Sequence, residues 1–164
     1  MDPRPLVVML VDHRTRDLPV AALLGAKLEE LGLAVKLVPL EAYKAVLSAY
    51  RPALVLFNHL LGSHLEAYSR RLNDLGVLVG VLLNEGIILH KPTLQFNVGK
   101  DYPNTHVDLF FAWNEVHAEV LRQAAYLKGN EITIVGNPRF DFYFPPWRDV
   151  FVPPRSEPGT KPSL

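Results

Sequence analysis

Four short polar segments of this chain each follow an apolar run, and they gather carboxylates, histidines and arginines. Glu85 and Asp141 stand out, because two carboxylates on neighbouring strand ends can act as base and nucleophile, or as acid and stabiliser, at a sugar carbon. The alternative is that Glu85 caps the next segment and Asp141 pairs with Arg139. Spacing alone favours this alternative over a catalytic role. The four segments are residues 12–17 (DHRTRD), 58–64 (NHLLGSH), 84–92 (NEGIILHKP) and 136–141 (GNPRFD).

The first of these segments contains no glycine, so it is not a dinucleotide-binding turn, which needs glycines to approach a pyrophosphate closely. No Walker sequence occurs either. Arg14 and Arg16 are suited instead to a carboxylate or phosphate group. The alternative is that both arginines belong to a solvated loop in which they pair with Asp12 and Asp17.

The six histidines show no spacing typical of a metal site. His59 and His64 share one polar segment and are candidates for lining a cleft, while His117 falls on an expected helix and should be partly exposed. We therefore expect neither a metal nor a cofactor.

Composition limits the class of protein. The chain has 164 residues, of which 49% are hydrophobic, so one domain can bury an ordinary core. Seventeen acidic residues balance 17 basic ones, which gives no sign of a nucleic-acid partner. There is no cysteine, so thiolate chemistry and disulfides are excluded. The N-terminal apolar run, residues 6–11, is too short for a signal sequence or a membrane span, and we expect a soluble cytoplasmic chain.

Apolar runs alternate with segments of helical periodicity along most of the chain. This alternation predicts an α/β fold, with a Rossmann-like, doubly wound, mostly parallel sheet of about six strands and helices on both faces. Residues 1–143 should form this domain, and residues 144–164, which hold six of the 14 prolines, should be a linker or a disordered tail. Strands are expected at 6–11, 34–40, 52–58, 77–84, 107–113 and 131–136, and helices at 18–32, 41–50, 63–76 and 114–127.

Taken together, several motifs resemble those of bacterial surface carbohydrate biosynthesis proteins, which look like glycosyltransferases of the two-domain GT-B architecture. The resemblance covers residues 5 to about 143. Its most specific element is Gly136-Asn137-Pro138-Arg139 followed by Asp141, and the next is Arg16-Asp17-Leu18. The other matching stretches are DHRTRDLPVAALLGAKLEELG, NEGI and DLFFAWNEVHAEVL.

The resemblance implies that the chain is the N-terminal, acceptor-side half of such an enzyme, acting on a saccharide acceptor. A nucleotide sugar would bind only through a separate C-terminal donor domain, so the chain would be a truncated or split product. A membrane-bound assembly complex would be a peripheral partner. Glu85 and Asp141 would be catalytic, and the substrate would be bound by Arg16, His13, His59, Gly86, Asn137 and Arg139.

Two readings compete with this one. In the family pattern, two adjacent acids and two glycines are expected where this chain has Asn84, Glu85, Gly86 and Ile87. That departure favours a stand-alone carbohydrate-binding module that has kept the fold without the chemistry. Half of a sugar-nucleotide epimerase has a similar two-domain shape, but it fits the matched turns less well.

Overall fold

The computed structural model describes residues 3–60, 62–84, 107–123 and 131–151. In this part of the chain, six strands form one sheet in the order β2-β1-β3-β4-β5-β6, and every neighbouring pair is parallel. The α/β class and the doubly wound, Rossmann-like sheet expected from the sequence are thereby confirmed. The strands are β1 (Leu6–Val11), β2 (Ala34–Pro39), β3 (Leu54–Phe57), β4 (Leu78–Leu82), β5 (Leu109–Ala112) and β6 (Glu131–Ile134).

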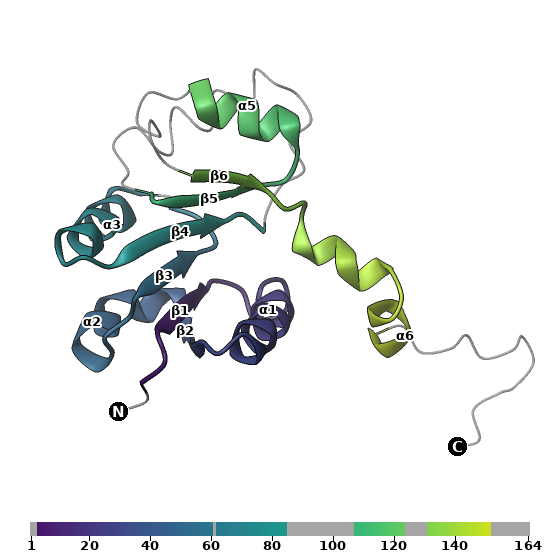
Figure 1. The fold of residues 1–164 in the computed structure, drawn as a ribbon, viewed down its shortest axis with the longest axis horizontal. Coiled ribbons are helices and arrows are strands. Elements are labelled where there is room, and N and C mark those ends of the chain that lie inside the picture. The colour runs from purple at the N-terminus through teal and green to yellow at the C-terminus, as the bar shows by residue number, and fades with distance from the viewer. Residues whose placement is uncertain (1–2, 61, 85–106, 124–130, 152–164) are drawn as a thin grey trace, which may run out of the picture.

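Helices lie on both faces of this sheet (Figure 1). On one face, α1 (Leu18–Glu30) packs against β1 and β2. On the other face, α2 (Val46–Ala49), α3 (Ser63–Asp74) and α5 (Glu115–Gln123) contribute to the larger core cluster. The helix expected over residues 41–50 is in fact a 3-10 helix, η1 (Leu40–Ala45), that runs directly into the single turn of α2.

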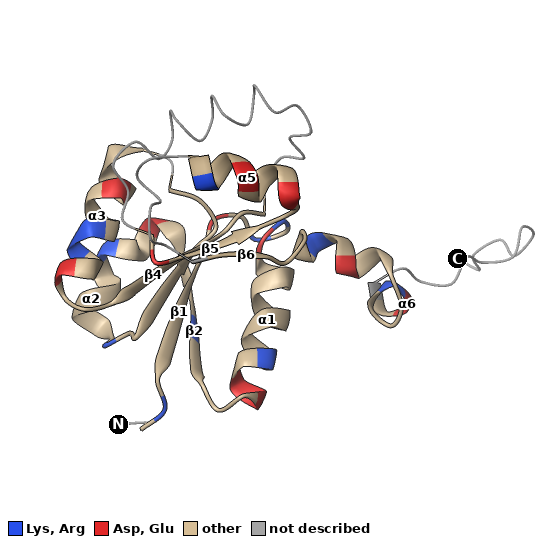
Figure 2. Cartoon of the chain, turned by 45° about the horizontal axis from the view of Figure 1, so that its top comes forward, with Lys and Arg blue, Asp and Glu red and all other residues tan. Residues whose placement is uncertain are grey.

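The strands are continuously apolar because both of their faces are covered, as in other parallel sheets. Val8, Val55, Val79 and Val81 point into the core under α2, α3 and α5, and each is completely buried. Complete burial of a side chain of this size contributes about 1.5–3 kcal/mol to the free energy of unfolding. Charged residues lie mainly on the helices and connecting loops (Figure 2). The polar side chains next to the sheet therefore lie mainly in the loops at the ends of its strands.

After β6 the chain leaves the sheet. Gly136 turns it at φ +80°, and two short helices follow, η3 (Pro138–Tyr143) and α6 (Trp147–Phe151). Figure 1 shows them extending away from the sheet. Part of the segment expected as a linker or disordered tail, residues 147–151, is thus a short helix, and residues 152–164 lie outside the described part.

Candidate functional site at the carboxyl edge of the sheet

The strand order reverses between β1 and β3. From β1 the chain continues to β2 on one side of β1, whereas β3 and the strands that follow it lie in sequence on the other side of β1. Loops that leave two such strands diverge and open a crevice, which is where parallel α/β sheets bind their ligands. The segments after β1 and β3 are two of the four polar segments noted in the sequence. This switch point is therefore the place at which to look for a site.

Arg16 is the centre of an ion-pair cluster at the switch point. Its Nη2 lies 2.7 Å from Asp12 Oδ2, and its Nε lies 2.8 Å from Asp17 Oδ1. The Arg16 side chain is 19% exposed and that of Asp12 is 34% exposed, whereas Asp17 is buried. Arg16 thus forms the ion pairs expected of the alternative reading, but the cluster is half-buried rather than freely solvated. Asp12 is the most exposed of the three side chains in this cluster.

Asp17 connects the two loops of the crevice. Its Oδ2 accepts hydrogen bonds from the backbone N–H of His13 over 2.9 Å and from Asn58 Nδ2 over 3.1 Å. Burial alone would raise the pKa of Asp17, but the Arg16 and His13 hydrogen bonds, the Arg16 charge and the Asn58 hydrogen bond together hold that pKa below its usual value. The buried carboxylate is therefore held ionised by the surrounding donors.

Two histidines predicted to bind substrate flank this cluster. His59 Nε2 is 3.6 Å from Asp12 Oδ2, too long for a hydrogen bond but close enough for the ring to be oriented by the carboxylate. His13 is exposed, and its Nδ1 accepts the backbone N–H of Arg16 over 3.3 Å. The structure thus brings Arg16, His13 and His59 together around Asp12.

Two asparagines close the inner end of the crevice. Asn58 follows β3, and Asn84 follows β4 after Leu83; each is 7% exposed. The amide oxygen Oδ1 of each is buried and has no hydrogen-bond partner in the described part of the chain. Both side chains, with Asp17, line a small cavity of about 20 Å³, which is room for one water or one hydroxyl group. Two buried acceptors without donors among the described residues are costly, and a donor from a ligand or from solvent would remove that cost.

The turn that contains Gly136, Asn137, Pro138 and Arg139 has a clear local cause. Asn137 Oδ1 accepts the backbone N–H of Arg139 over 3.1 Å and so caps η3, and Pro138 occupies the first turn, where its missing N–H costs nothing. The capped turn sends Arg139 back toward the sheet, where Nη1 donates to the backbone oxygen of Asn84 over 3.5 Å. Arg139 is therefore the substrate-binding candidate from this turn that reaches the crevice.

Asp141, the carboxylate predicted to be catalytic, takes a different direction. It is exposed and lines an apolar cavity on the α1 side of the sheet, together with Pro138 and Trp147. Arg139 therefore reaches back to the end of β4, and Asp141 borders the cavity beside α1. Glu85 and Gly86, the other candidates that the sequence suggested, lie outside the described residues.

His117 differs from its expectation. It is buried at 3% exposure rather than partly exposed, and burial lowers its pKa to about 4. Its Nδ1 accepts the backbone N–H of Trp113 over 3.3 Å, and its ring meets those of Phe110 and Trp113 edge to face. This histidine therefore lies on the buried face of α5 and is neutral at pH 7.

Asp12, Asp17, Asn58 and Asn84 were not singled out as site residues from the sequence. A signal for the asparagines was present, since LVLFN and GVLLN are buried strands that both end in an amide. Asp17 belongs to the matched Arg16-Asp17-Leu18 motif, but its link to Asn58 could not be predicted, because the two residues are 41 positions apart in the chain.

No family model, curated protein or solved structure matches this chain. Within the described residues, no three histidine, aspartate or glutamate side chains gather as metal ligands. None of the helices in those same residues is long and apolar enough to cross a bilayer.

Proposed function

We propose that this chain is a saccharide-binding domain of surface polysaccharide biosynthesis, working in the cytoplasm as the acceptor-side half of a GT-B-like glycosyltransferase. The observation that carries the proposal is the pair of unpartnered amide oxygens, Asn58 Oδ1 and Asn84 Oδ1, buried beside an ion-paired carboxylate cluster at the switch point. Sugar hydroxyls are donors as well as acceptors, so one hydroxyl can satisfy an amide oxygen and still accept from a neighbour. The proposal is also supported by the resemblance of the Gly136–Arg139 turn to that of bacterial surface carbohydrate biosynthesis proteins.

Each side chain of the crevice has a role in this proposal. The amide oxygens receive sugar hydroxyls, Arg139 donates to a ring or hydroxyl oxygen from the β4 side, and Arg16 holds Asp12 in place. Asp12, next to His59, is the exposed carboxylate of the cluster. A carboxylate in this position can take the proton of an acceptor hydroxyl as that hydroxyl attacks the anomeric carbon of a nucleotide-sugar donor. The bond from that carbon to the diphosphate breaks, and the nucleoside diphosphate leaves with the electron pair. We keep Glu85 and Asp141 in this proposal as further catalytic carboxylates.

The proposal separates binding from transfer. In this proposal one hydroxyl group of the acceptor enters the small cavity between Asp17, Asn58 and Asn84, and the donor would be held by a second domain or partner. A stand-alone carbohydrate-binding module is the second candidate, and the ion pairs that already occupy Arg16 favour it, because they leave less of its charge for a phosphate.

The test is to apply the full chain to an array of bacterial surface oligosaccharides and, separately, to nucleotide sugars by calorimetry. We expect saccharide binding that is weakened at least tenfold by Asp12→Asn and unchanged by Asp74→Asn, which makes the same change at the end of α3. Binding of nucleotide sugars should be weak or absent. If no oligosaccharide binds, or if Asp12→Asn binds as well as the unmodified chain, the proposal fails. Both candidates should bind saccharide without turnover when this chain is assayed alone. Saccharide binding without transfer when a separate donor-binding domain and a nucleotide sugar are both supplied would select the stand-alone module.

A further inference from the structure

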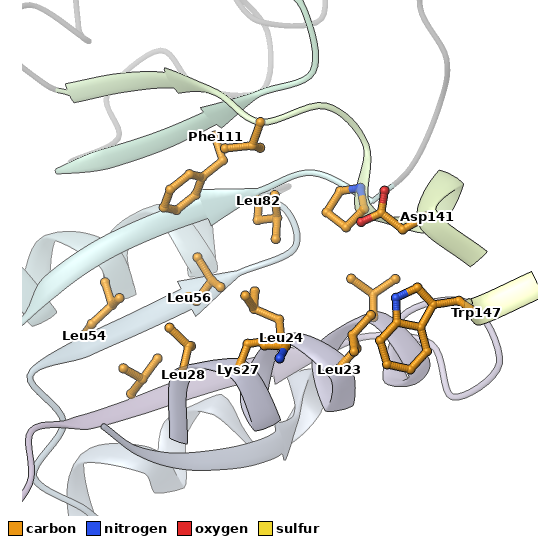
Figure 3. A pocket seen from close by; sticks show the side chains of 14 residues that line it. Leu23, Leu24, Lys27, Leu28, Leu54, Leu56, Leu82, Phe111, Asp141 and Trp147 are labelled. Carbon is orange, nitrogen blue, oxygen red and sulfur yellow. The ribbon is translucent and has the colours of Figure 1, made fainter. Parts of the chain in front are cut away.

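An apolar cavity lies beside the small polar cavity at the switch point, and Val20, Leu56 and Leu82 line both. It has a volume of about 500 Å³ and is bordered by α1 on one side and by β3, β4 and β5 on the other. Figure 3 shows Leu24 and Leu28 of α1 facing Leu56 and Leu82 of the sheet across it. We call this space the apolar cavity. All but two of its lining residues, Lys27 and Asp141, are apolar.

The cavity has a structural cause. Of the described helices that connect strands, α1 alone packs on this face, and it contacts β1 and β2. The apolar residues Leu54 and Phe111 on the neighbouring strands are therefore only partly buried. At the carboxyl edge of the sheet, Trp147 from α6 lies at the end of the space (Figure 3), and Pro138 from η3 is another of its lining residues.

The dimensions of the apolar cavity decide which occupant fits. Its lining extends along α1 from Val20 to Leu28, which is about 12 Å at the helical rise of about 1.5 Å per residue. A volume of about 500 Å³ over that length gives a mean cross-section of about 40 Å². A linear aliphatic chain fits, and 12 Å corresponds to about ten bonds of an extended chain.

The ends of the apolar cavity orient such a chain. Asp141 and the Trp147 side chain lie where the strands end, at the same sheet edge as the polar segments, and Asp141 is exposed (Figure 3). The opposite end, near Leu54 and Leu28, contains no polar side chain apart from Lys27, whose Nζ is held 2.7 Å from Glu30 Oε2. A hydroxyl or other hydrogen-bond donor at the head of the chain would therefore meet the Asp141 carboxylate.

We propose that the apolar cavity binds one aliphatic chain of an amphiphile, with its polar head at Asp141 on the carboxyl edge of the sheet. Pockets of this volume and apolar character are typical of small-molecule sites. The inference rests on the volume, lining and direction of this space, which adjoins the proposed saccharide site, and its test uses ligands without a sugar.

The test is calorimetric titration of the full chain with 1-hexanol, 1-octanol, 1-decanol and 1-dodecanol, none of which carries a sugar. Each methylene buried in the cavity should raise the affinity about fourfold. The gain should stop near ten carbons, where the cavity is full. Affinity that does not change with chain length would overturn the proposal, as would a gain that continues unchanged to dodecanol, which indicates partition onto an open surface.

Matched variants locate the binding. Val135 and Ile134 are neighbours with similar exposure, 47% and 44%, but only Val135 lines the cavity. We expect Val135→Asp to weaken decanol binding at least tenfold and Ile134→Asp to leave it unchanged. On α1, Leu28→Trp should fill the cavity and block binding, whereas Leu31→Trp, at a position 79% exposed, should not. Equal affinities within both pairs would show that decanol binds elsewhere and would overturn the proposal.

Discussion

The side chain of Asn58 donates a hydrogen bond to Asp17 Oδ2 over 3.1 Å, and this bond joins the end of β3 to the start of α1. Both side chains are buried. They lie in the segments that follow β1 and β3, the two strands between which the strand order reverses. The crevice is therefore held in shape by its own polar residues before any ligand arrives. Arg16 adds the second connection, from Asp17 to the exposed carboxylate of Asp12.

The first prediction concerns Asp17. We expect Asp17→Asn to lower the free energy of unfolding at pH 7 by about 2–3 kcal/mol, because charge-assisted hydrogen bonds from Arg16, His13 and Asn58 are lost or weakened. The pKa of Asp17 is lowered in the folded chain, so its contribution is present above the ordinary aspartate pKa of 3.8 and is lost as pH falls through the folded pKa. Urea unfolding at pH 7 and pH 3 measures the difference, which should shrink at pH 3. A difference that stays constant with pH would contradict this account.

The second prediction concerns His117. The folded pKa of about 4 lies below the ordinary histidine pKa of 6.5, so the unfolded chain binds more protons between these two values. Stability should therefore fall as pH is lowered from 6.5 to 4, by about 3 kcal/mol from this residue. In His117→Gln that part of the pH dependence should disappear, while His64→Gln, at an exposed position of α3, should retain it. Urea unfolding at half-unit pH steps will show whether the slope belongs to His117.

The sequence predicts the sheet well because its strands are buried on both faces and read as apolar runs, as LVVMLV over residues 6–11 does. The polar edge could be predicted as well, since the segments after buried strands must lie there. The partners within it could not. Which donors reach Asp17, and that Arg139 turns toward Asn84 while Asp141 lines the apolar cavity, depend on contacts between residues distant in the chain. His117 was misjudged, although its spacing of three and four residues from Val120 and Leu121 places it on the apolar face of the helix.

The third prediction concerns the unpartnered amide oxygen of Asn84. Leucine has a similar shape and no polar atom, so Asn84→Leu removes an unsatisfied buried acceptor. We expect the free chain to become more stable by about 1 kcal/mol and to bind saccharide at least tenfold more weakly, a trade-off typical of binding sites. Thermal unfolding and the oligosaccharide array measure the two effects. If Asn84→Leu lowers stability and leaves binding intact, Asn84 is a structural residue.

The last prediction concerns the turn after β6. Asn137→Ala removes the oxygen that caps η3 and should cost about 1 kcal/mol, whereas Asn137→Asp keeps an acceptor at the same place and should cost little. Gly136→Ala should cost about 1–2 kcal/mol, because a side chain is disfavoured at φ +80° even though no atom stands in its way. Native-state hydrogen exchange at the Arg139 and Phe140 amides measures these changes locally. Because the cap also directs Arg139 toward Asn84, Asn137→Ala should weaken saccharide binding and Asn137→Asp should preserve it. Equal exchange rates and equal binding in the two variants would mean that the cap holds neither the turn nor Arg139.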